Sequence, residues 1–315
     1  MPWTKALMNL NSNRTVVIIA GPTATGKTKL SIKLATHFNT EIISADSRQF
    51  YKELKIGTAA PDASELSEAR HHFIGHISIH DYYNVSLYEQ QALQCADTIF
   101  KNHPFLFVTG GSGLYISAFC HGIDDLPDPK PEIRQKLLDI LQNEGIDSLR
   151  RQLSEADPEY YAMTDLANPK RLMRALEVYY STGLKYSQLR KNQPKSRNFR
   201  LIKIGINRDR NELAEIIGKR VDAMIAKGLV EEARTYYPLR HLNALNTVGY
   251  KEIFDYFDDK ITFEKAVENI KTNTRRYAKR QMTWFRKDPD FRWFHPDDTE
   301  NIIRYIESFT TGKKG

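Results

Sequence analysis

The segment Gly21–Thr28 restricts the possible folds more than any other part of the chain. It reads G-P-T-A-T-G-K-T and matches the phosphate-loop pattern G-x-x-x-x-G-K-[ST] in full. The preceding run Thr15–Ala20 is apolar and β-branched, which is typical of a strand buried on both faces of a parallel sheet. Lys27–Phe38 then shows helical periodicity. Because strand, loop and helix occur in the required order, we favour a genuine phosphate loop over a chance match in a glycine-rich turn.

The chemistry of this loop is that of a phosphate site. Its glycines let backbone N–H groups converge on phosphate oxygens, and the following helix presents its positive N-terminal end. Lys27 adds a point charge, and the hydroxyl of Thr28 suits Mg²⁺. The pattern is specific for phosphates and does not single out ATP. The expected binding residues are Gly21, Pro22, Thr23, Ala24, Thr25, Gly26, Lys27 and Thr28.

Further short apolar runs indicate more strands of the same sheet. Glu41–Ser44 and Phe105–Thr109 are two of them, and a helical pattern at about Ser86–Lys101 lies between them. Strands that alternate with helical crossovers predict an α/β fold, a P-loop core with a doubly wound parallel sheet. In such sheets ligands bind at the carboxyl ends of the strands. The aromatic stretch Phe291–Phe294 is consistent with an edge strand.

The character of the chain changes after about residue 122. Leu126–Pro131 is a proline-rich connector, and helical patterns follow it at Glu132–Asn143, Ser148–Ser154 and Pro169–Ser181. Leu201–Ile206 has strand character again, and helical segments lead from there to the end of the chain. We therefore predict a P-loop catalytic core made of residues 1–121 and 200–315, with residues 122–199 as a helical insertion.

Polar and glycine-rich turns follow the second and third predicted strands. Asp46 comes just after the second strand, where the sheet would present it beside the phosphate loop. Three roles are compatible with this position: association with a metal, general base catalysis, or a bond to its own backbone in a turn. The turn Gly110–Tyr115 follows the third strand, and its glycines suit either close approach of a ligand or tight strand-to-helix packing.

Residues Thr262–Arg286 are predicted to form one long helix with a strongly basic surface. No acidic residue lies between Lys271 and Lys287. A solvated helix face usually mixes charges of both signs, so this single-sign run favours a polyanionic partner such as nucleic acid. The stripe expected to face the core is Phe263, Val267, Ile270, Thr274, Tyr277, Gln281 and Trp284. The cations off that stripe are Lys271, Arg275, Arg276, Lys279, Arg280, Arg286 and Lys287.

Composition adds limits on the class of protein. The 315 residues are 41% hydrophobic and 27% charged, which argues against disorder, and no apolar run is long enough to span a bilayer. The stretch Met1–Arg14 lacks the apolar region of a secretory signal, so we expect a cytoplasmic protein without a membrane partner. We also expect a monomer, although no feature of the sequence determines the oligomeric state. Cys95 and Cys120 lack metal-ligand spacing and are expected to be structural thiols. The net charge is +7, and the positive charges cluster late in the chain, which fits a polyanionic partner for that region.

Taken in order, these motifs resemble those of the bacterial tRNA dimethylallyltransferases, also called the tRNA isopentenyltransferase family, from about residue 15 to residue 295. Each motif alone is weak evidence, whereas the ordered set is strong evidence. The motifs are Gly21–Thr28, Asp46–Gln49 (D-S-R-Q), Ile56–Ala59 (I-G-T-A), Gly110–Tyr115 (G-G-S-G-L-Y), Asn168–Glu177 (N-P-K-R-L-M-R-A-L-E), Val248–Glu252 (V-G-Y-K-E) and Arg275–Arg286 (R-R-Y-A-K-R-Q-M-T-W-F-R).

The resemblance implies transfer of a dimethylallyl group from dimethylallyl diphosphate to N6 of the adenosine that adjoins the anticodon of tRNA on its 3′ side. It implies that the P-loop holds the prenyl diphosphate rather than a nucleoside triphosphate, with Mg²⁺ as cofactor and Thr28 as its ligand. Asp46 would act as the base, and Thr23, Lys27 and Arg220 would join Thr28 at the diphosphate. Arg220 is placed by the pattern Lys219–Met224.

The same resemblance implies a set of residues for the anticodon stem-loop, with the helical insertion as a clamp on the tRNA. These residues are Asp46, Ser47, Arg48, Gln49, Ser112, Arg134, Lys170, Arg171, Leu172, Met173 and Arg174, to which the basic helix adds Arg275, Arg276, Lys279 and Arg280.

The chain departs from the family pattern at three positions. Ala60 stands where a lysine usually follows Gly-Thr-Ala, and Ser112 stands where threonine is usual. Gly75 stands where an aspartate usually follows the paired histidines, here His71 and His72. Serine keeps the hydroxyl of threonine, whereas each of the other two changes loses a charge.

Three other functions stay open from the sequence. A prenyltransferase for free AMP or ADP would need the same diphosphate site but no long basic helix. A P-loop small-molecule kinase would consume ATP in the presence of a phosphoryl acceptor. An RNA-binding module would use its P-loop only to regulate binding and would leave tRNA unmodified.

Overall fold

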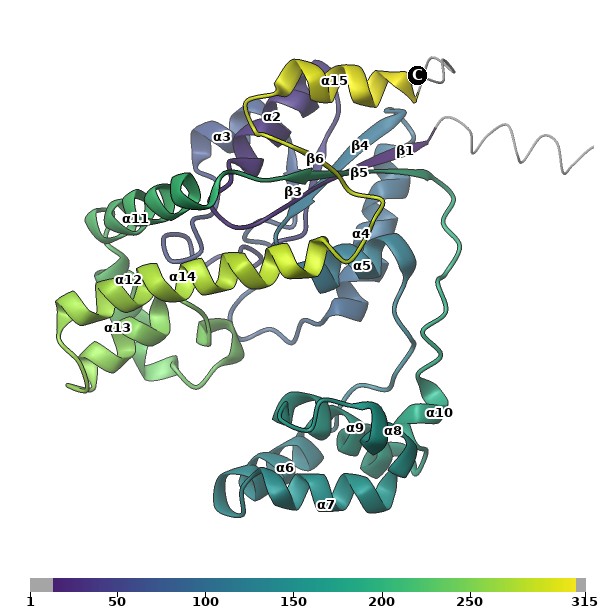
Figure 1. The fold of residues 1–315 in the computed structure, drawn as a ribbon, viewed down its shortest axis with the longest axis vertical. Coiled ribbons are helices and arrows are strands. Elements are labelled where there is room, and N and C mark those ends of the chain that lie inside the picture. The colour runs from purple at the N-terminus through teal and green to yellow at the C-terminus, as the bar shows by residue number, and fades with distance from the viewer. Residues whose placement is uncertain (1–13, 310–315) are drawn as a thin grey trace, which may run out of the picture. The chain divides into compact units, whose positions relative to one another are not determined.

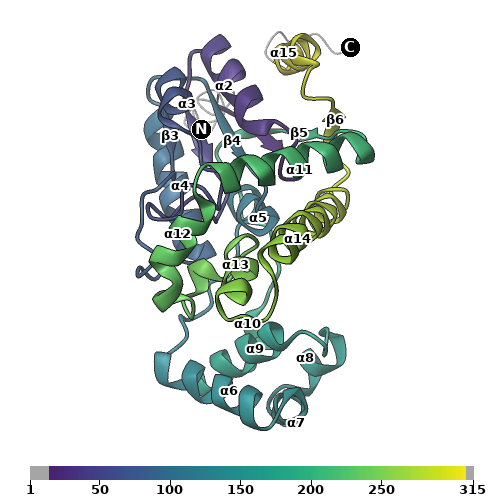
Figure 2. The same ribbon diagram turned by 90° about the vertical axis from the view of Figure 1, so that its left-hand side faces the viewer.

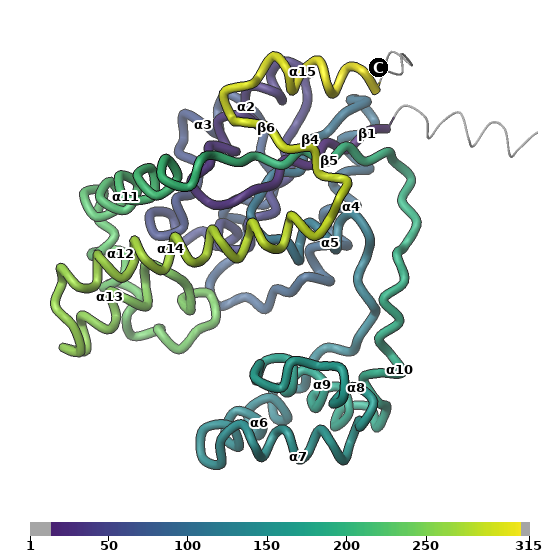
Figure 3. Tube along the Cα trace, in the orientation of Figure 1, coloured from purple at the N-terminus to yellow at the C-terminus, as the bar shows by residue number. Residues whose placement is uncertain are grey.

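The computed structural model describes residues 14–309, and the chain divides into two compact units. Unit 1 comprises the residues up to Cys120 and those from Arg197 onward, and unit 2 comprises His121–Ser196. The chain leaves unit 1 once and returns to it once (Figure 3). The polar stretch on which the expectation of no secretory signal rests lies almost entirely outside the described residues.

Unit 1 is built on a parallel sheet, which within residues 14–309 has six strands in the order β3-β2-β4-β1-β5-β6 (Figure 1). This arrangement confirms the predicted α/β fold with a P-loop core. β1 lies near the centre, in register with β4 on one side and β5 on the other. The strands are β1 (Thr15–Ala20), β2 (Ile42–Ser44), β3 (His71–His72), β4 (Phe105–Gly110), β5 (Arg200–Ile206) and β6 (Arg292–Phe294).

Helices cover both faces of this sheet (Figure 1). Alternate residues of β1 point to opposite faces, as the pleat of a strand requires. Val17 and Ile19 pack with the apolar sides of α2 (Lys27–His37) and α15 (Thr299–Ser308). Val16 and Ile18 pack with those of α4 (Val85–Ile99) and α5 (Gly113–His121). A short helix, α3 (Ala63–Glu68), connects β2 and β3 and begins with a capping box at Asp62.

The rest of unit 1 is a group of helices that share their own core. The members are α11 (Arg210–Ala226), α12 (Leu229–Tyr236), α13 (Tyr250–Phe257) and α14 (Phe263–Phe285), with 3-10 turns at Tyr237–Leu239 and Asn243–Leu245. α14 packs against α11 and α13 (Figure 2). The side chain of Thr262 accepts a hydrogen bond from the Lys265 N–H and starts α14, so the predicted long helix is confirmed to within one residue at each end.

The predicted core stripe of α14 is partly wrong. Ile270 and Gln281 are buried as expected, whereas Trp284 is 46% exposed and Phe285 is buried in its place. The reason is the spacing: the helix places the fourth residue after Gln281 in the core, where Phe285 packs edge-on against Phe291 at 5.6 Å between ring centroids. The predicted stripe instead continued three residues after Gln281, to Trp284.

Helices are the only regular elements of unit 2 among its described residues, 121–196. Its helices are α6 (Pro131–Asn143), α7 (Ile146–Ala156), α8 (Pro158–Met163), α9 (Pro169–Thr182) and α10 (Tyr186–Leu189). Leu149, Leu153, Leu172 and Leu176 are fully buried and form the centre of a separate hydrophobic core. Because this core draws on residues of unit 2 alone, the unit has its own packing to hold it together.

The two cysteines are unpaired. Cys120 is buried and Cys95 is half-buried. Burial raises the pKa of Cys120 to about 12 and that of Cys95 to about 11. Both side chains therefore stay as thiols at neutral pH and are unsuited to act as nucleophiles.

Candidate active site

The phosphate loop connects the carboxyl end of β1 to the first turn of α2. Gly26 has φ of 92°, a left-handed conformation that glycine adopts easily, and α2 begins at the next residue. Inside the loop, the Pro22 carbonyl accepts hydrogen bonds from the Thr25 hydroxyl at 2.8 Å and from Lys27 Nζ at 2.6 Å. These bonds hold the loop closed around the start of the helix and aim its N–H groups at one point.

A cavity of about 270 Å³ opens over this loop and extends to the carboxyl end of β2. Of the three lysine and arginine residues that line it, Lys29 is exposed, whereas Lys27 and Arg220 of α11 are partly buried. Neither of these two has a carboxylate oxygen within 4.0 Å among residues 14–309. The charged form of a buried side chain is costly unless a counterion is present. The cavity is therefore built to receive an anion. Its lining includes Thr23, Ala24, Gly26, Lys27, Thr28, Asp46, Gln49, Glu65, His71 and Arg220.

The electrostatics of the two cations follow from their burial. Burial lowers the pKa of Lys27 to about 8, an effect that the Asp46 carboxylate opposes and Arg220 reinforces. Burial also lowers the pKa of Arg220, against the pull of the carboxylates of Asp46 and Glu65. Both shifts show that the folded chain concentrates positive charge where water is scarce. A bound diphosphate would relieve this repulsion.

A second cavity, of about 380 Å³, adjoins the first. The two cavities share three lining residues, Thr23, Asp46 and Arg220. Its lining combines the ring of Tyr277, polar and cationic side chains, and backbone turns from distant parts of unit 1. Its lining includes Ser47, Arg48, Gly57, Thr58, Val221, Met224, Asn246, Thr247, Val248, Lys251, Ile270, Thr274, Tyr277 and Arg280.

Asp46 stands at the junction of the two cavities, just past the end of β2. Its Oδ1 accepts one hydrogen bond, from the Arg48 backbone N–H at 3.1 Å, which fixes the carboxylate in a turn. Oδ2 is left for other partners. The turn geometry that the sequence offered as one explanation of Asp46 is present, and it orients a carboxylate that also faces both cavities. The two interpretations are therefore compatible.

Ser47, Ser112 and Tyr277 form a small polar group beside Asp46. Ser112 Oγ accepts a hydrogen bond from the Ser47 N–H at 3.0 Å and lies 3.0 Å from Ser47 Oγ. Tyr277 is hydrogen-bonded to Ser112 as well, and burial, helped by the Asp46 carboxylate, raises the pKa of Tyr277 to about 12. The phenol therefore keeps its proton at neutral pH and can donate a hydrogen bond inside the second cavity.

Gln281 ties the basic helix directly to the phosphate loop. This side chain of α14 is buried, its Oε1 accepts from the Thr23 N–H at 2.9 Å, and its Nε2 donates to the Gly111 carbonyl at 2.8 Å. A Cβ atom at Gly111 would lie 2.2 Å from Nε2, so only glycine permits this approach. The sequence pattern placed Gln281 in the core stripe, but gave no sign that its amide would bridge two glycine-rich loops.

Glu232 of α12 holds the loop that carries the I-G-T-A motif. Its carboxylate accepts from the backbone N–H groups of Lys55, Ile56 and Gly57 at 2.8–3.1 Å, and from the Tyr250 hydroxyl at 2.6 Å. Gly57 lines the second cavity. Sequence analysis missed Glu232, because nothing near it distinguishes it from other acidic residues on a helix surface.

Arg48 has a structural partner that the sequence did not reveal. Its guanidinium donates to the backbone carbonyls of Asn243, Ala244 and Asn246 at 3.1–3.4 Å, and so fixes the segment that leads to Asn246 and Thr247 in the second cavity. Gln49 lines the first cavity and donates to the Ala59 carbonyl at 3.0 Å. Both side chains hold the walls of the site from within.

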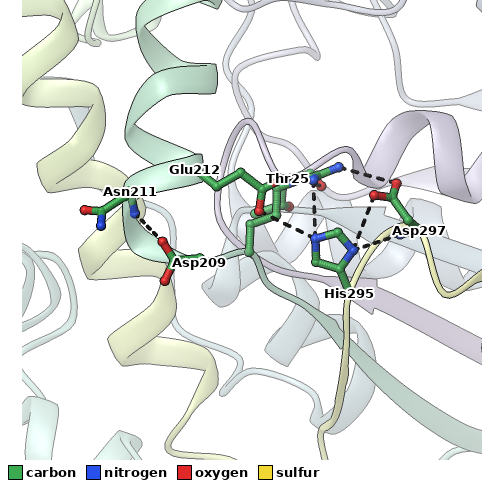
Figure 4. Close-up of polar contacts among 7 residues, drawn as sticks. Thr25, Asp209, Asn211, Glu212, His295 and Asp297 are labelled. Atoms are coloured by element: carbon green, nitrogen blue, oxygen red, sulfur yellow. Dashed lines mark hydrogen bonds and ion pairs between the residues drawn. The ribbon is translucent and has the colours of Figure 1, made fainter.

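A charged cluster supports the phosphate loop from the side of β5 and β6. Arg208 Nε donates to the Thr25 carbonyl at 3.2 Å, and its guanidinium pairs with Glu212 and Asp297. His295 lies between those two carboxylates, 3.5 Å from Glu212 and 3.4 Å from Asp297 (Figure 4). This cluster anchors Thr25 from outside the two cavities. It was not predicted, because it joins residues that are 87 to 183 positions apart in the sequence.

The cationic face of α14 is exposed along Arg275, Arg276, Lys279 and Arg280. One expected member differs: Lys271 Nζ lies 2.6 Å from Asp222 of α11, so its charge is already paired. The expectation of an unneutralised run holds within the helix, and fails for Lys271 because a neighbouring helix supplies the carboxylate.

In unit 2, the predicted tRNA-binding residues fall into two groups. Lys170 and Arg171 are exposed at the start of α9. Leu172 and Met173 are buried in the core of the unit, so only their backbone could meet a partner, and their expected role as tRNA contacts stays a prediction. They occupy the same run because a helix turns successive residues to different faces.

The two arginines of that set surround a buried carboxylate. Arg134 lies 3.1 Å and Arg174 3.7 Å from oxygens of Glu177, which is 2% exposed. Burial raises the pKa of Glu177 despite both cations. Arg174 also donates to the Pro127 carbonyl at 3.0 Å, so it fastens the connector of unit 2 to α9.

No residue set in the described part of the chain resembles a protein-only metal cage, since residues 14–309 contain no group of three or more His, Cys, Asp or Glu that could hold a metal ion. A metal here would need ligands from a bound diphosphate and water.

None of the helices formed by residues 14–309 has both the length and the apolar character needed to cross a membrane.

Comparisons with known proteins agree with this geometry. The family model described as IPP transferase matches residues 49–288. The tRNA dimethylallyltransferase of Christiangramia forsetii is 54% identical over 294 residues, which cover 93% of this chain and 97% of that protein. tRNA dimethylallyltransferase 1 of Phocaeicola vulgatus is 50% identical over 294 residues, which cover 93% of this chain and 98% of that protein.

Solved structures of similar proteins share the fold. A tRNA isopentenylpyrophosphate transferase from Bacillus halodurans has a TM-score of 0.68 and 35% identity, with 95% of this chain and 96% of that chain covered. A eukaryotic dimethylallyltransferase acting on tRNA has a TM-score of 0.77 and 25% identity, with 96% and 80% covered. The phosphate loop, the two joined cavities and these similarities lead to one conclusion: the chain belongs to the IPP transferase family, that of the tRNA dimethylallyltransferases.

Proposed function

We propose that the chain transfers a dimethylallyl group from dimethylallyl diphosphate to N6 of the adenosine that adjoins the tRNA anticodon on its 3′ side, and releases diphosphate. The observation that carries this proposal is the pair of cavities that meet at Thr23, Asp46 and Arg220. One cavity lies over the phosphate loop, and the other combines the Tyr277 ring with polar and cationic side chains, a lining that suits a purine nucleotide. Both the named relatives and the family model support the same reaction.

The diphosphate end of the donor belongs in the first cavity. Lys27, Arg220 and the amides of the phosphate loop would bind its oxygens and stabilise the charge that grows on them as the allylic carbon–oxygen bond breaks. Such electrostatic stabilisation is often the largest single contribution to catalysis. Because neither cation has a carboxylate within ion-pair distance among residues 14–309, both are free to serve the leaving group. ATP is not required for this chemistry.

Asp46 is the proposed general base. The exocyclic amine of adenine is a weak nucleophile, since its lone pair is delocalised into the ring, and it must lose a proton as the new bond to carbon forms. Asp46 faces both cavities, and one of its two carboxylate oxygens makes no hydrogen bond to the Arg48 turn. A well-placed base contributes roughly 10²–10⁴-fold to the rate.

Magnesium is the proposed cofactor, and the donor set at the phosphate loop fits it. Thr28 presents a hydroxyl to the first cavity and Asp46 a carboxylate. Mg²⁺ prefers one or two protein oxygens together with phosphate oxygens and water, and does not require an all-protein cage. When bound with the diphosphate, it would neutralise part of the leaving-group charge.

The tRNA would bind through cations that α14 and unit 2 expose, among them Arg276, Arg280, Lys170 and Arg171. An adenosine in an anticodon loop must leave its stack to enter the second cavity, at a cost of a few kcal/mol that phosphate contacts would offset. We propose unit 2 as the clamp. A cytoplasmic monomer is sufficient for this task, because one chain lines both cavities.

The deciding experiment offers the protein dimethylallyl diphosphate, Mg²⁺ and unmodified tRNA, and then analyses the nucleosides by mass spectrometry. The expected product is N6-dimethylallyl adenosine at one position. Parallel reactions replace tRNA by AMP, or the donor by ATP with a phosphoryl acceptor. Prenylated AMP would support the free-nucleotide prenyltransferase, consumption of ATP would support the kinase, and unmodified tRNA would contradict the proposal.

A further inference from the structure

Trp284 is the most unusual exposed side chain on α14. The indole is 46% exposed, whereas the next residue, Phe285, is buried in the core, so the ring offers an apolar face to solvent on the cationic side of the helix. The pyrrole edge of the indole rests on Gly113 at the start of α5: a Cβ atom at Gly113 would lie 2.3 Å from ring Cδ1 and 2.4 Å from Nε1. Backbone therefore supports one part of the ring, and solvent meets the rest.

The indole is available to a partner. Among residues 14–309, no other aromatic ring or cation is paired with it, and its N–H makes no hydrogen bond. By contrast, the other aromatic side chain on this face, Tyr277, is bonded to Ser112 and has Arg280 over its ring at 5.8 Å. The backbone at Gly113 thus holds the Trp284 ring in place, while its exposed face and its N–H make no aromatic, cation–π or hydrogen-bond contact among residues 14–309.

The position of Trp284 links it to the proposed adenosine site. It follows Tyr277 by seven residues, or two helical turns, so both lie on the same face of α14, about 10 Å apart along the axis. Tyr277 and Arg280 line the second cavity, and Trp284 does not. The indole therefore lies about one helical turn past Arg280, the last residue of α14 that lines the cavity. The exposed cations Arg280 and Lys287 lie about one turn before and one turn after it.

We propose that Trp284 is a stacking platform for an unpaired tRNA base next to the target adenosine. This inference rests on the proposed function, and it adds a recognition residue outside the two cavities. When the target base leaves its stack, its neighbours lose a stacking partner. An exposed indole can replace that partner, and it can do so for any of the four bases because each has a flat aromatic face. The flanking cations match the phosphates of the same nucleotides, which is why RNA fits this surface better than a protein partner does.

The test compares three variants of the full-length protein: Trp284→Ala, Trp284→Phe and Trp284→Leu. Loss of one base–aromatic stack should weaken tRNA binding by about 5- to 150-fold in Trp284→Ala. Trp284→Phe should recover most of this loss, whereas Trp284→Leu, which keeps apolar packing on Gly113, should not. The KM for dimethylallyl diphosphate should stay unchanged in all three.

Two controls separate stacking from other effects. Tyr82 is 59% exposed in the same unit, lines neither cavity, and Tyr82→Ala should leave tRNA affinity unchanged. The salt dependence of binding gives the second control, since the indole binds no phosphate and the log–log slope of Trp284→Ala should keep its wild-type value. Equal affinities for Trp284→Leu and Trp284→Phe would reduce the indole to simple packing and overturn the proposal.

Fluorescence gives a direct readout. The chain has three tryptophans, and replacing Trp3 and Trp293 by phenylalanine leaves Trp284 as the single reporter. Stacking on a base should quench its emission when an unmodified anticodon stem-loop binds. If the complex forms but the Trp284 emission is not quenched, the proposed stack is refuted. The proposed function fails in a different way, since tRNA would then stay unmodified by the wild-type protein.

Discussion

The charges around Lys27 make the empty phosphate loop less favourable than the same loop with a bound anion. The pKa of Lys27 is lowered to about 8, because its charged form has lost hydrating water and faces Arg220. At neutral pH the charged lysine therefore destabilises the substrate-free protein. A diphosphate reverses this balance. The same burial that weakens the empty site strengthens every interaction with the anion.

Lys27→Met follows from that balance. Removing the cation should lower kcat by about 10²–10³-fold, because charge on the leaving group loses a partner in the transition state. It should also raise the Tm of the substrate-free protein at pH 7. In the unfolded chain the lysine titrates near its ordinary pKa, so the unfolded state binds more protons between about pH 8 and pH 10.5 and wild-type stability rises across this window.

Thermal unfolding of both proteins at pH 7 and pH 10.5 checks this prediction. The advantage of Lys27→Met should be full at pH 7 and should disappear toward pH 10.5. Wild-type affinity for dimethylallyl diphosphate should fall as the pH rises past 8, since the empty site then lacks the proton. A variant with unchanged turnover at saturating donor would contradict the role given to Lys27.

Asp46→Asn separates the roles proposed for this carboxylate. The amide keeps the shape and can still accept the Arg48 N–H, but it cannot take a proton. A general base predicts a fall in kcat of about 10²-fold or more with near-normal binding of both substrates. A metal-holding role predicts partial recovery at high Mg²⁺, so kcat measured across a magnesium titration decides. A nearly unchanged rate would leave Asp46 as a turn residue.

Gln281→Met tests the bridge between the two glycine-rich loops. The methionine fills a similar volume and removes both hydrogen bonds, so the Thr23 N–H and the Gly111 carbonyl lose their partners at about 1–3 kcal/mol each. We expect a Tm lower by several degrees and a higher KM for the donor, measured by thermal unfolding and steady-state kinetics. Arg276→Ala on the exposed face is the control for Tm. Unaltered donor binding would show that the bridge serves stability alone.

At the scale of elements, α14 combines three duties on three faces. One face packs into the core through Ala278 and Phe285, a second lines the second cavity through Ile270 and Tyr277, and a third exposes cations. The 3.6-residue period makes this possible, because a 23-residue helix repeats each face about six times. A change that shifts the helix along its axis would therefore disturb the core, the cavity and the cationic surface together.

The cationic face predicts a change in salt dependence. Arg276→Ala with Arg280→Ala should weaken tRNA binding, and each phosphate left without its cation should flatten the log–log salt slope by about 0.9 for a duplex-like partner and about 0.7 for a single strand. Lys271→Ala is the matched control, because Asp222 already pairs that charge and the slope should hardly move. Binding titrations at several salt concentrations give the slopes. Wild-type affinity and slope in the double variant would make this face an ordinary solvated surface.

At the scale of the whole molecule, the sequence predicts what periodicity and local chemistry determine. The sheet, the phosphate loop and the long helix follow from buried β-branched runs, a glycine pattern and spacing by three and four. β3 was missed because two residues are too short to show a period. Trp284 was misplaced because a stripe at the end of a helix continues equally well by three residues or by four.

The site was less predictable than the fold. Lys27, Asp46 and Arg220 line one cavity, and their predicted roles stay predictions, whereas the junction of the two cavities depends on tertiary packing. Glu232, Gln281 and Arg208 act through backbone groups of distant loops, and no local pattern announces such partners. Gly75 illustrates the reverse case, since its φ of 55° gives a physical reason for glycine that the motif pattern could not supply.

The common wall of the two cavities has a consequence for inhibition. Since donor and acceptor sites adjoin at Thr23, Asp46 and Arg220, a single compound that joins a diphosphate mimic to a purine would need only a short linker. Binding of its first half turns binding of the second into an intramolecular event, at an effective concentration in the millimolar range for short linkers. Such a bisubstrate ligand would bind far more tightly than either half. Its length would measure the distance that the transferred group must travel.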